Sequence, residues 1–461
     1  MTTVTDQNLI DHFRLRQHQL PDYDLPWLRE TRRRGLERFQ QQGFPGLAKG
    51  RRREHWKYTD TRAIAETRYW QTAPKAGRIE EQLAHFILFE QPFNRLVFVN
   101  GNYVPGLSRL PDLAEQRQAG LVIESLTDTL ISKPALISDY LNALADDENF
   151  PFAALNTGLL EHGAVIYVPE GVELNQPVHV LFISTPPGGT SESFNVNPRL
   201  LVVAEANSRF DLIEHHGSVM SEPEQQDAGD NRALSNCVTE IVLHDSAHCR
   251  YTRIHQENSR QVNLGATYVQ QDRNSTFESY TVCLGGALLR NDLNVQLAGE
   301  GAQCALQGLY TLQGHEHADN HTCIDHLAVR CSSREYYKGL IDDQAHAVFN
   351  GRIHIHPGAQ KTDAMLQNKN LLLSAQAEVD TKPELEIYAD DVRCAHGATV
   401  GELSNEQIHY LESRCIDRQT ARSMLSLAFA NEIIETLPYD ELRRGVYDHV
   451  AQRMMEKTKE Q

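Results

Sequence analysis

A degenerate repeat between residues 163 and 400 is the feature that most constrains the fold of this chain. Short apolar runs recur there, and each is followed at once by a turn of small or polar residues. The runs and their turns include 164–168 before 169–171, 201–203 before 205–208, 241–243 before 245–247, 294–297 before 299–301, 352–355 before 357–359, and 371–373 before 374–377. Stacking such units buries a core that no single unit can bury alone, so the pattern predicts a β-solenoid.

A β-sandwich of ordinary hairpins is the alternative architecture. Hairpins favour two-residue turns, for which Asn-Gly and Asp-Gly are the strongest signals. These signals are scarce, with Asn100-Gly101 and Asn350-Gly351 as the clear cases. The scarcity favours the solenoid. Two loops, at 185–191 and at the acidic stretch 221–231, interrupt the regular region.

Helical patterns flank the repeat on both sides. Apolar and charged residues alternate at helical spacing over 6–19, 27–43, 79–89 and 134–147, so we expect residues 1–150 to form a mainly helical domain. The β-helix core is then expected over 151–402.

A second helical domain is expected over 403–461. Ser404 followed by Gln407 is typical of a capping box that starts its first helix. A second helix is predicted from Asp417 or Arg418 to Ile434, and a third over 439–455. Apolar residues recur in the third helix at every fourth position: Leu442, Val446, Val450 and Met454.

The composition argues against several classes of function. With 461 residues, 40% of them hydrophobic, and a formal charge of -18, the chain suits a globular protein better than a binder of nucleic acid or of anionic membranes. The opening residues lack the apolar stretch of a secretory signal, and no run approaches a membrane span. The 8 cysteines show no paired spacing, which fits reduced thiols. We expect a cytoplasmic protein.

Residues 390–401, Asp-Asp-Val-Arg-Cys-Ala-His-Gly-Ala-Thr-Val-Gly, place a thiol and an imidazole two residues apart. If the run is a strand, Cys394 and His396 point the same way, with Asp390 behind them. Thiolate and imidazole ligands suit zinc, copper or iron-sulfur species rather than calcium or magnesium. Two ligands are too few for a structural zinc site, which takes four. The pair is a candidate for part of a metal or cluster site.

A second group of ligand-forming residues lies between positions 315 and 326. If this segment is a strand, five of its side chains share one face: His315, His317, His321, Cys323 and Asp325. A mononuclear metal site is one interpretation, and a polar ladder on the solenoid surface is the other. The ladder is the more common structural solution.

Motifs for two enzyme classes are missing from the sequence. It has no Gly-x-x-x-x-Gly-Lys-Ser/Thr loop to cradle phosphates and no Gly-x-Ser-x-Gly nucleophile elbow. Any ATP hydrolysis linked to this chain is therefore expected in a partner.

Several long motifs carry a resemblance to a known family. They are Asp319-Asn320-His321-Thr322, Phe349-Asn350-Gly351-Arg352-Ile353, Pro357-Gly358-Ala359-Gln360-Lys361-Thr362-Asp363, Asn370-Leu371-Leu372-Leu373-Ser374, Pro383-Glu384-Leu385-Glu386-Ile387, the run with Cys394 and His396, and an N-terminal Glu54-His55-Trp56-Lys57-Tyr58-Thr59. The chain resembles the SufB/SufD family of the SUF machinery, which assembles iron-sulfur clusters, and within it the SufD branch.

The resemblance implies a right-handed parallel β-helix between two helical domains. It also implies a complex with SufB through the β-helix and with the SufC ATPase through the C-terminal helices. SufB-like chains carry a cysteine near residues 361–367 and a glutamate after the histidine of the last motif. This chain has no cysteine there, and Gly397 follows His396. Cys394 and His396 are then expected to contribute to a transient iron-sulfur cluster formed mainly on SufB.

Two functions from different classes remain in view. The first is a non-catalytic scaffold subunit of the SUF complex that supports cluster assembly and iron acquisition. The second is a β-helix polysaccharide-processing enzyme that uses Asp390 and Asp391 as paired carboxylates. Flavin binding by the complex and a homodimer of the isolated chain are left open.

Overall fold

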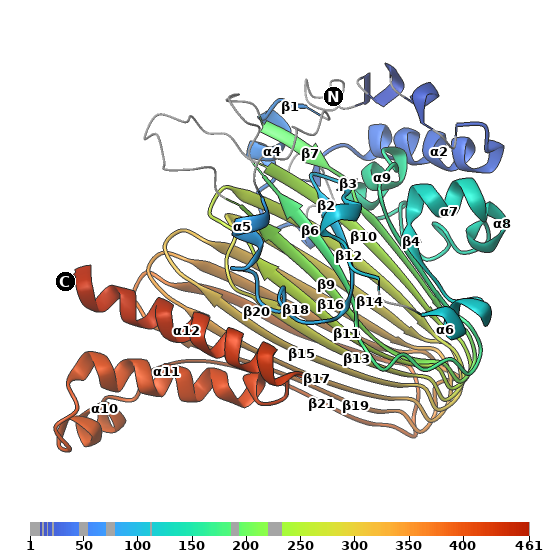
Figure 1. Cartoon of the computed structure of the whole chain (residues 1–461). Helices are drawn as coiled ribbons and strands as arrows, with labels where there is room; N and C mark the ends of the chain where they lie inside the picture. Colours follow the sequence, from blue (N-terminus) through green and yellow to red (C-terminus); the bar gives the residue numbers. More distant parts are fainter. Residues whose placement is uncertain are drawn as a thin grey trace.

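The computed structural model describes residues 10–11, 13–15, 17–20, 23–45, 54–70, 79–110, 113–185, 193–219 and 233–460. Two large β-sheets face each other along most of that length, and helices lie at both ends of the chain (Figure 1). Residues 186–191 of the first predicted loop and all of the loop at 221–231 lie outside these ranges, as does the start of the helix predicted at 6–19. No helix in the described ranges is long and apolar enough to cross a membrane.

The first sheet, sheet A, runs in space in the order β20-β18-β16-β14-β12-β10-β8-β5-β4, with β1 and β7 joined at its side. Its strands are β1 (Tyr69–Trp70), β4 (Val122–Ser125), β5 (Gly163–Val168), β7 (Ser193–Val196), β8 (Arg199–Ala204), β10 (Ala233–Leu243), β12 (Gln261–Gln271), β14 (Leu288–Leu297), β16 (His317–His326), β18 (His346–Ile355) and β20 (Glu378–Ile387).

The second sheet, sheet B, has the order β21-β19-β17-β15-β13-β11-β9-β6-β2-β3. Its strands are β2 (Asn94–Val99), β3 (Asn102–Tyr103), β6 (Val178–Ser184), β9 (Arg209–Ser218), β11 (His248–Gln256), β13 (Thr276–Cys283), β15 (Gln303–Leu312), β17 (Ser332–Ile341), β19 (Asp363–Leu372) and β21 (Arg393–Glu402).

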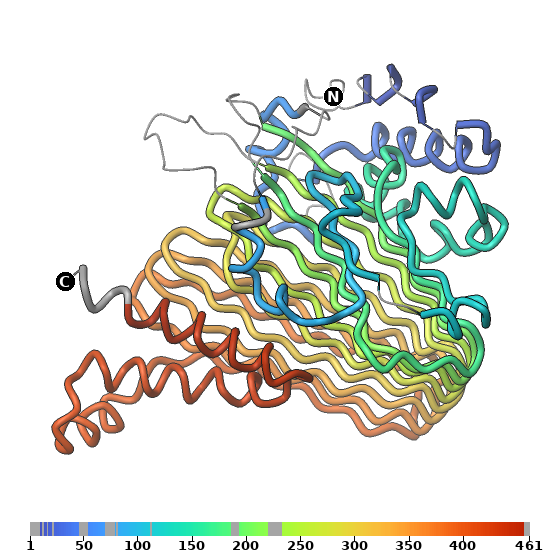
Figure 2. Tube along the Cα trace, viewed as in Figure 1, coloured from blue at the N-terminus to red at the C-terminus, as the bar shows by residue number. Residues whose placement is uncertain are grey.

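The chain alternates between the two sheets, so each coil contributes one strand to each (Figure 2). Neighbouring strands are parallel from β5 onward along sheet A and from β6 onward along sheet B. In the later coils the strands pair over their whole length without a bulge. Leu288, His317 and His346 are neighbours in register, at a spacing of 29 residues. The predicted β-solenoid is confirmed, and the hairpin sandwich is wrong.

One corner of the solenoid repeats the same backbone device in successive coils. The residue at this corner has a positive φ of 57° to 74°, and its N–H donates to a carbonyl of the next coil. The corner residues are Asn207, Ser246, Asn274, Gly301, Arg330 and Lys361. Asparagine and glycine accept this left-handed conformation most readily, which explains the small and polar turns between the runs. The last rung joins the Lys361 N–H to the Asp391 carbonyl.

The space between the sheets, the lumen, holds a largely apolar core with isolated polar side chains. Glu335 of β17 is one of them, and it lies in register between Leu306 and Leu366. The Thr322 hydroxyl donates to its carboxyl at 2.6 Å. Burial raises the pKa of Glu335 to about 7, and the Thr322 hydrogen bond opposes this rise.

We expect Glu335→Gln to stabilise the protein at alkaline pH but not at acidic pH. An unfolded chain releases this proton near the ordinary pKa of 4.5, whereas the native carboxyl keeps it to about pH 7. The native state therefore binds the extra proton between these values, and wild-type stability falls as pH rises through the window. At about 1.4 kcal/mol per pKa unit, the wild type loses about 3 to 4 kcal/mol of stability that the variant retains. Urea unfolding of both proteins on each side of the window measures the difference, and parallel pH profiles would contradict it.

The N-terminal region contains helices as predicted, but most of them are short. Its principal helix, α2 (Pro26–Gln42), packs on α9 (Pro151–Gly158). A Cβ atom on Gly35 would lie 2.6 Å from the Gly158 nitrogen, so only glycine permits this contact. The other described helices are short: η1 (Gln17–Gln19), α4 (Arg62–Glu66), α5 (Glu80–Leu83), η3 (Pro105–Leu107), α6 (Ala114–Gln118), α7 (Leu126–Ser132) and α8 (Pro134–Ile137).

Two of the predicted N-terminal helices are wrong over most of their length. Only α5 is helical within 79–89, because Ile79, Leu83 and Phe86 pack on Val97 and Val99 of β2 and the chain turns to make that contact. Only α8 is helical within 134–147. Strands β2, β3 and β4 extend both sheets into residues 1–150.

Three helices close the chain: α10 (Asn405–Glu412), α11 (Arg418–Ile434) and α12 (Asp440–Glu460). The Ser404 hydroxyl accepts the Gln407 N–H, which confirms the predicted cap. Leu442, Val446 and Val450 are fully buried with α11 residues against the outer face of sheet B. The predicted apolar stripe therefore packs on the solenoid itself.

Candidate functional site

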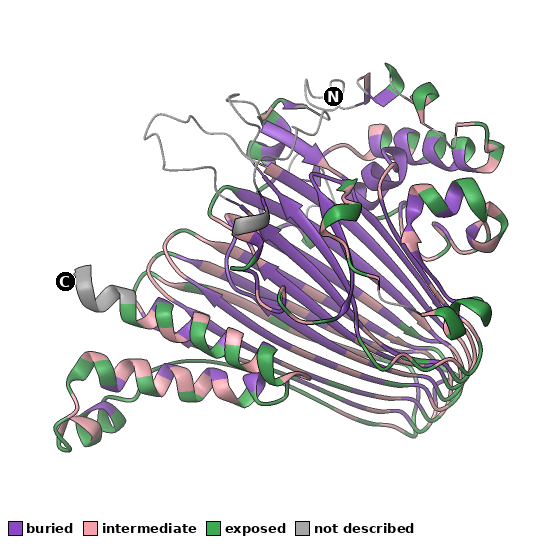
Figure 3. Ribbon diagram, viewed as in Figure 1, coloured by how far each residue is buried: buried purple, intermediate pink, exposed green. Residues whose placement is uncertain are grey.

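The solenoid ends in two strands with very different edges. In the described ranges no strand pairs with the far side of β20 or of β21. Strand β20 carries Pro383, Lys382 and several carboxylates, which are features that blunt an edge. Strand β21 is 10 residues long, has neither proline nor lysine, and is exposed over almost its whole length (Figure 3). The edge of β21 is therefore a template for another strand.

Cys394 and His396 lie on this open strand and project toward the lumen. They pair in register with Ala364 and Leu366, which are buried lumen residues of β19. Register neighbours point the same way, so Cys394 and His396 share one face, as predicted. That face lies at the mouth of the solenoid. Asp390 lies in the bend before β21, so strand alternation does not place it behind them.

The two side chains differ in exposure. His396 is exposed, whereas Cys394 is half-buried and packs against the lumen core. Burial raises the pKa of Cys394, the Ala364 backbone opposes the rise, and Asp363 adds to it. Cys394 is thus a protonated thiol, and not a thiolate, at neutral pH in the isolated chain. A bound metal or a positive partner group is needed to ionise it.

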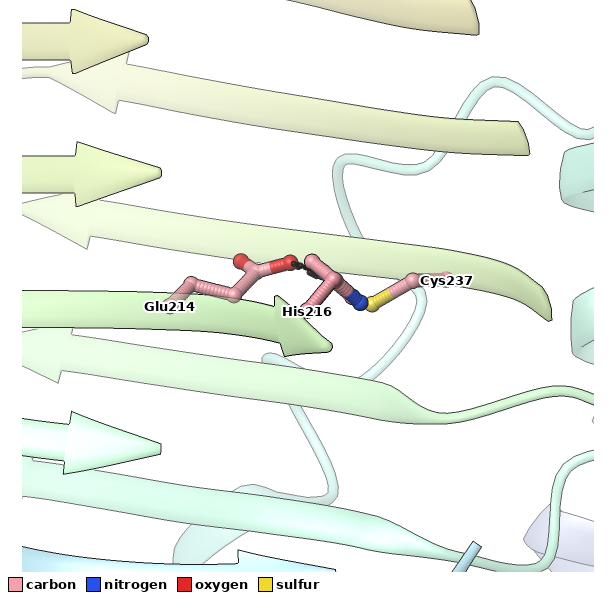
Figure 4. A group of neighbouring side chains, drawn as sticks. All are labelled: Glu214, His216 and Cys237. Atoms are coloured by element: carbon pink, nitrogen blue, oxygen red, sulfur yellow. Dashed lines mark hydrogen bonds and ion pairs between the residues drawn. The ribbon is translucent and has the colours of Figure 1, made fainter. Parts of the chain in front are cut away.

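A buried cluster of potential ligands lies deeper in the lumen (Figure 4). Glu214 of β9 has five partners: His216 Nε2 at 2.7 Å, Cys237 Sγ at 3.4 Å, Thr239 Oγ1 and Tyr251 OH at 2.7 Å each, and Arg253 Nη2 at 3.4 Å. Burial alone would raise the pKa of Glu214, but Arg253, His216 and Tyr251 together hold it well below its usual range.

This cluster is better explained as a closed ion-pair network than as a metal site. Both oxygens of Glu214 are engaged, and the Arg253 guanidinium already supplies the positive charge. Burial raises the pKa of Cys237 well above its usual value, so its thiol stays neutral. No motif or spacing in the sequence indicates this network, because its members come from three successive strands, β9, β10 and β11.

The residues between 315 and 326 share a face as predicted but do not form one site. His317, His321, Cys323 and Asp325 point outward from β16, whereas His315 lies in the preceding turn. His317 contacts Thr59, and His321 pairs with Asp319 at 2.8 Å. Cys323 donates to Asp325, which pairs with His354. A cleft of about 380 Å³ lies over this face, lined by these strands and by N-terminal residues that include His55 and Phe150.

The comparisons with known proteins agree with this architecture. Residues 188–429 match the family described as SUF system FeS cluster assembly, SufBD core domain, and residues 3–180 match the SufBD protein N-terminal region. The chain belongs to the SufBD family. Its SufBD core match ends inside α11 and includes the whole open end of the solenoid.

Individual relatives cover most of the chain. The iron-sulfur cluster assembly protein SufD of Escherichia coli (strain K12) is 32% identical over 88% of this chain and 89% of its own length. An iron-sulfur cluster assembly SufBD family protein of Synechocystis is 31% identical over 85% of this chain and 84% of its own length. The chloroplastic protein ABCI7 of Arabidopsis thaliana is 29% identical over 87% and 81%. The SufD relative supports the branch that the sequence motifs indicate.

Proposed function

We propose that this chain is a non-catalytic scaffold subunit of a SUF iron-sulfur cluster assembly complex, paired with SufB through the β-helix. The observation that carries the proposal is the open edge of β21, which combines an unblunted strand with Cys394 and His396. A partner strand added there would cover the mouth of the solenoid. It would also bring its own ligands beside this thiol and imidazole.

The chemistry of the pair suits a shared cluster. A neutral imidazole and a thiol that ionises on metal binding are both competent iron ligands, and two ligands from one chain leave the remaining positions to the partner. The cluster is the cargo of this site. The same edge is open to a second copy of the chain when SufB is absent.

The C-terminal helices offer a separate surface for the SufC ATPase. Their buried stripe packs on sheet B, yet four large apolar side chains remain exposed by 42% to 58%: Tyr410, Met424, Tyr447 and Met455. Exposed apolar side chains gathered on neighbouring helices are typical of protein docking sites. ATP hydrolysis in SufC would then act on this chain through α10 to α12, with the open edge as the element that moves.

Anaerobic reconstitution of the three-subunit complex with iron and sulfide tests the role of the pair. We expect Cys394→Ala and His396→Ala each to lower bound iron and acid-labile sulfide together, because each removes one ligand from the shared site. Subunit ratios measured on the same samples control for loss of assembly. Unchanged iron and sulfide in both variants would remove these residues from the mechanism.

The polysaccharide-processing alternative is not favoured. Asp390 and Asp391 stand at the last corner of the solenoid, where the Asp391 carbonyl accepts the Lys361 N–H and its N–H donates to Gln360. The backbone of this corner is part of the row of hydrogen bonds that joins the corners of successive coils. The family relatives are named as cluster-assembly proteins.

A further inference from the structure

Three side chains on the outer face of sheet A converge at the end of β16 and β18. Asp325 and His354 are direct neighbours in register, and His356 follows β18 by one residue. The Asp325 Oδ1 atom lies 2.8 Å from His354 Nδ1 and 3.4 Å from His356 Nε2. The two imidazole ring centroids are 3.9 Å apart. Two imidazoles and one carboxylate thus present one donor atom each to a common point.

The spacing of these donor atoms matches that around a small divalent ion. Bonds of about 2.1 Å to nitrogen or oxygen place ligand atoms about 3.0 Å apart in octahedral geometry and about 3.4 Å apart in tetrahedral geometry. The two donor distances given for Asp325 span nearly the same interval. An ion can therefore replace the hydrogen that His354 and Asp325 share, with only small movements of the side chains.

Neighbouring groups hold the carboxylate and one ring in position. The Cys323 thiol donates to Asp325 Oδ2 at 3.6 Å, which leaves Oδ1 facing the two imidazoles. Tyr388 meets the His354 ring edge-on with centroids 5.6 Å apart. Such contacts orient ligands before a metal arrives.

The local charge also suits a cation. The Arg352 guanidinium donates to the Cys323 sulfur at 3.2 Å and pairs with Glu386 at 3.6 Å, so its positive charge is matched. Lys382 pairs with Glu384 at 2.6 Å. The carboxylate of Asp325 therefore leaves this part of the face with an excess of negative charge.

We propose that Asp325, His354 and His356 bind one divalent first-row transition metal ion, such as Fe²⁺, Co²⁺ or Zn²⁺. Imidazole and carboxylate donors select these ions over Mg²⁺ or Ca²⁺. The three side chains are 20% to 35% exposed, so an ion reaches them from solvent and solvent fills its remaining positions. On binding, His354 gives up its hydrogen bond to Asp325: the Nδ1 proton passes to solvent while Nε2 takes one up, and the neutral ring ligates through the Nδ1 lone pair. The site lies on sheet A, whereas Cys394 and His396 lie on sheet B, and it does not depend on the proposed function.

Titration of the full chain with Co²⁺ alone, followed by visible ligand-field absorption under reducing anaerobic conditions, tests this site. We expect Asp325→Asn and His354→Ala to weaken binding of one equivalent by about tenfold or more. His356→Gln should do the same, and it changes a side chain beyond the end of the strand, which guards against misfolding as the cause. Zn²⁺ should displace the same equivalent.

The matched control is His244→Ala. His244 pairs with Asp272 at 2.9 Å and is 28% exposed, but it belongs to no group of three ligands among the described residues. This variant should bind Co²⁺ as the wild type does. Equal numbers of bound ions and equal affinities in the wild type and in all three site variants would overturn the proposal, as would a wild-type chain that binds no Co²⁺.

Discussion

Replacing Glu214 by glutamine is expected to lower the free energy of unfolding by about 3 to 5 kcal/mol. Arg253 is 3% exposed and lies 3.4 Å from Glu214, so the variant leaves a guanidinium in the lumen without its counter-ion. The hydrogen bonds from Tyr251 and Thr239 also lose their charged acceptor. Urea unfolding followed by circular dichroism measures the change.

A surface pair provides the matched control for this effect. Asp245 and Arg273 lie 2.9 Å apart at a corner of the solenoid, and their side chains are about half exposed or more. Asp245→Asn should therefore change stability by at most about 1 kcal/mol. Replacing both lumen partners, as Glu214→Leu with Arg253→Met, should restore much of the loss because neither charge of this pair is then left buried without the other. Equal effects of Glu214→Gln and Asp245→Asn would contradict the description of a buried network.

The sequence identifies the solenoid strands mainly by their apolar ends. Its predicted runs at 241–243, 294–297 and 352–355 fall in the last residues of β10, β14 and β18. The first halves of the strands are not recognised because their inward side chains include polar groups such as Asn291, which is buried and donates to Asn320 of the next coil. The local pattern of apolar and polar residues does not show which residues of other coils will be their hydrogen-bond partners.

The terminal helices show where local sequence signals are enough to predict a helix and where they are not. Helix α11 begins after Asp417 and ends at Ile434, as its cap and apolar spacing predict. The segment 79–89 has similar spacing but keeps only the short helix α5, because contacts with β2 outweigh its helical preference. Intrinsic helix propensity decides the structure where a helix packs by one face only. Tertiary contacts override it where the side chains pack against a strand.

The candidate sites were predicted to different degrees. The common direction of Cys394 and His396 follows from strand alternation alone and is confirmed. The meeting of Asp325 with His354 requires the coil length, since positions 29 residues apart become neighbours. A search of the sequence at that spacing would have found the pair. The Glu214 network combines strands from several coils and follows no single spacing.

A charge placed at the mouth of the solenoid is expected to abolish pairing with SufB. Ala398 lies on the lumen side of β21, opposite Asn368, and is exposed in the isolated chain. Ala398→Glu therefore leaves the fold intact but buries an unpaired carboxylate when a partner covers the edge, at a cost of several kcal/mol. That cost weakens association by more than about 100-fold.

The neighbouring position supplies the control. Thr399 is also exposed but points to the opposite face of β21, so Thr399→Glu adds the same charge away from the mouth. SufC should remain bound in both variants, because its proposed docking surface lies on the C-terminal helices. Retention of SufC then shows that the chain has folded.

The subunit composition of complexes purified through a tag on this chain, after coexpression with SufB and SufC, is the most direct test of the scaffold role. Wild-type chain and Thr399→Glu should each recover SufB in equal amount together with SufC, and Ala398→Glu should recover SufC without SufB. Full recovery of SufB by Ala398→Glu, or recovery of neither partner by the wild type, would contradict assembly through the open edge of β21.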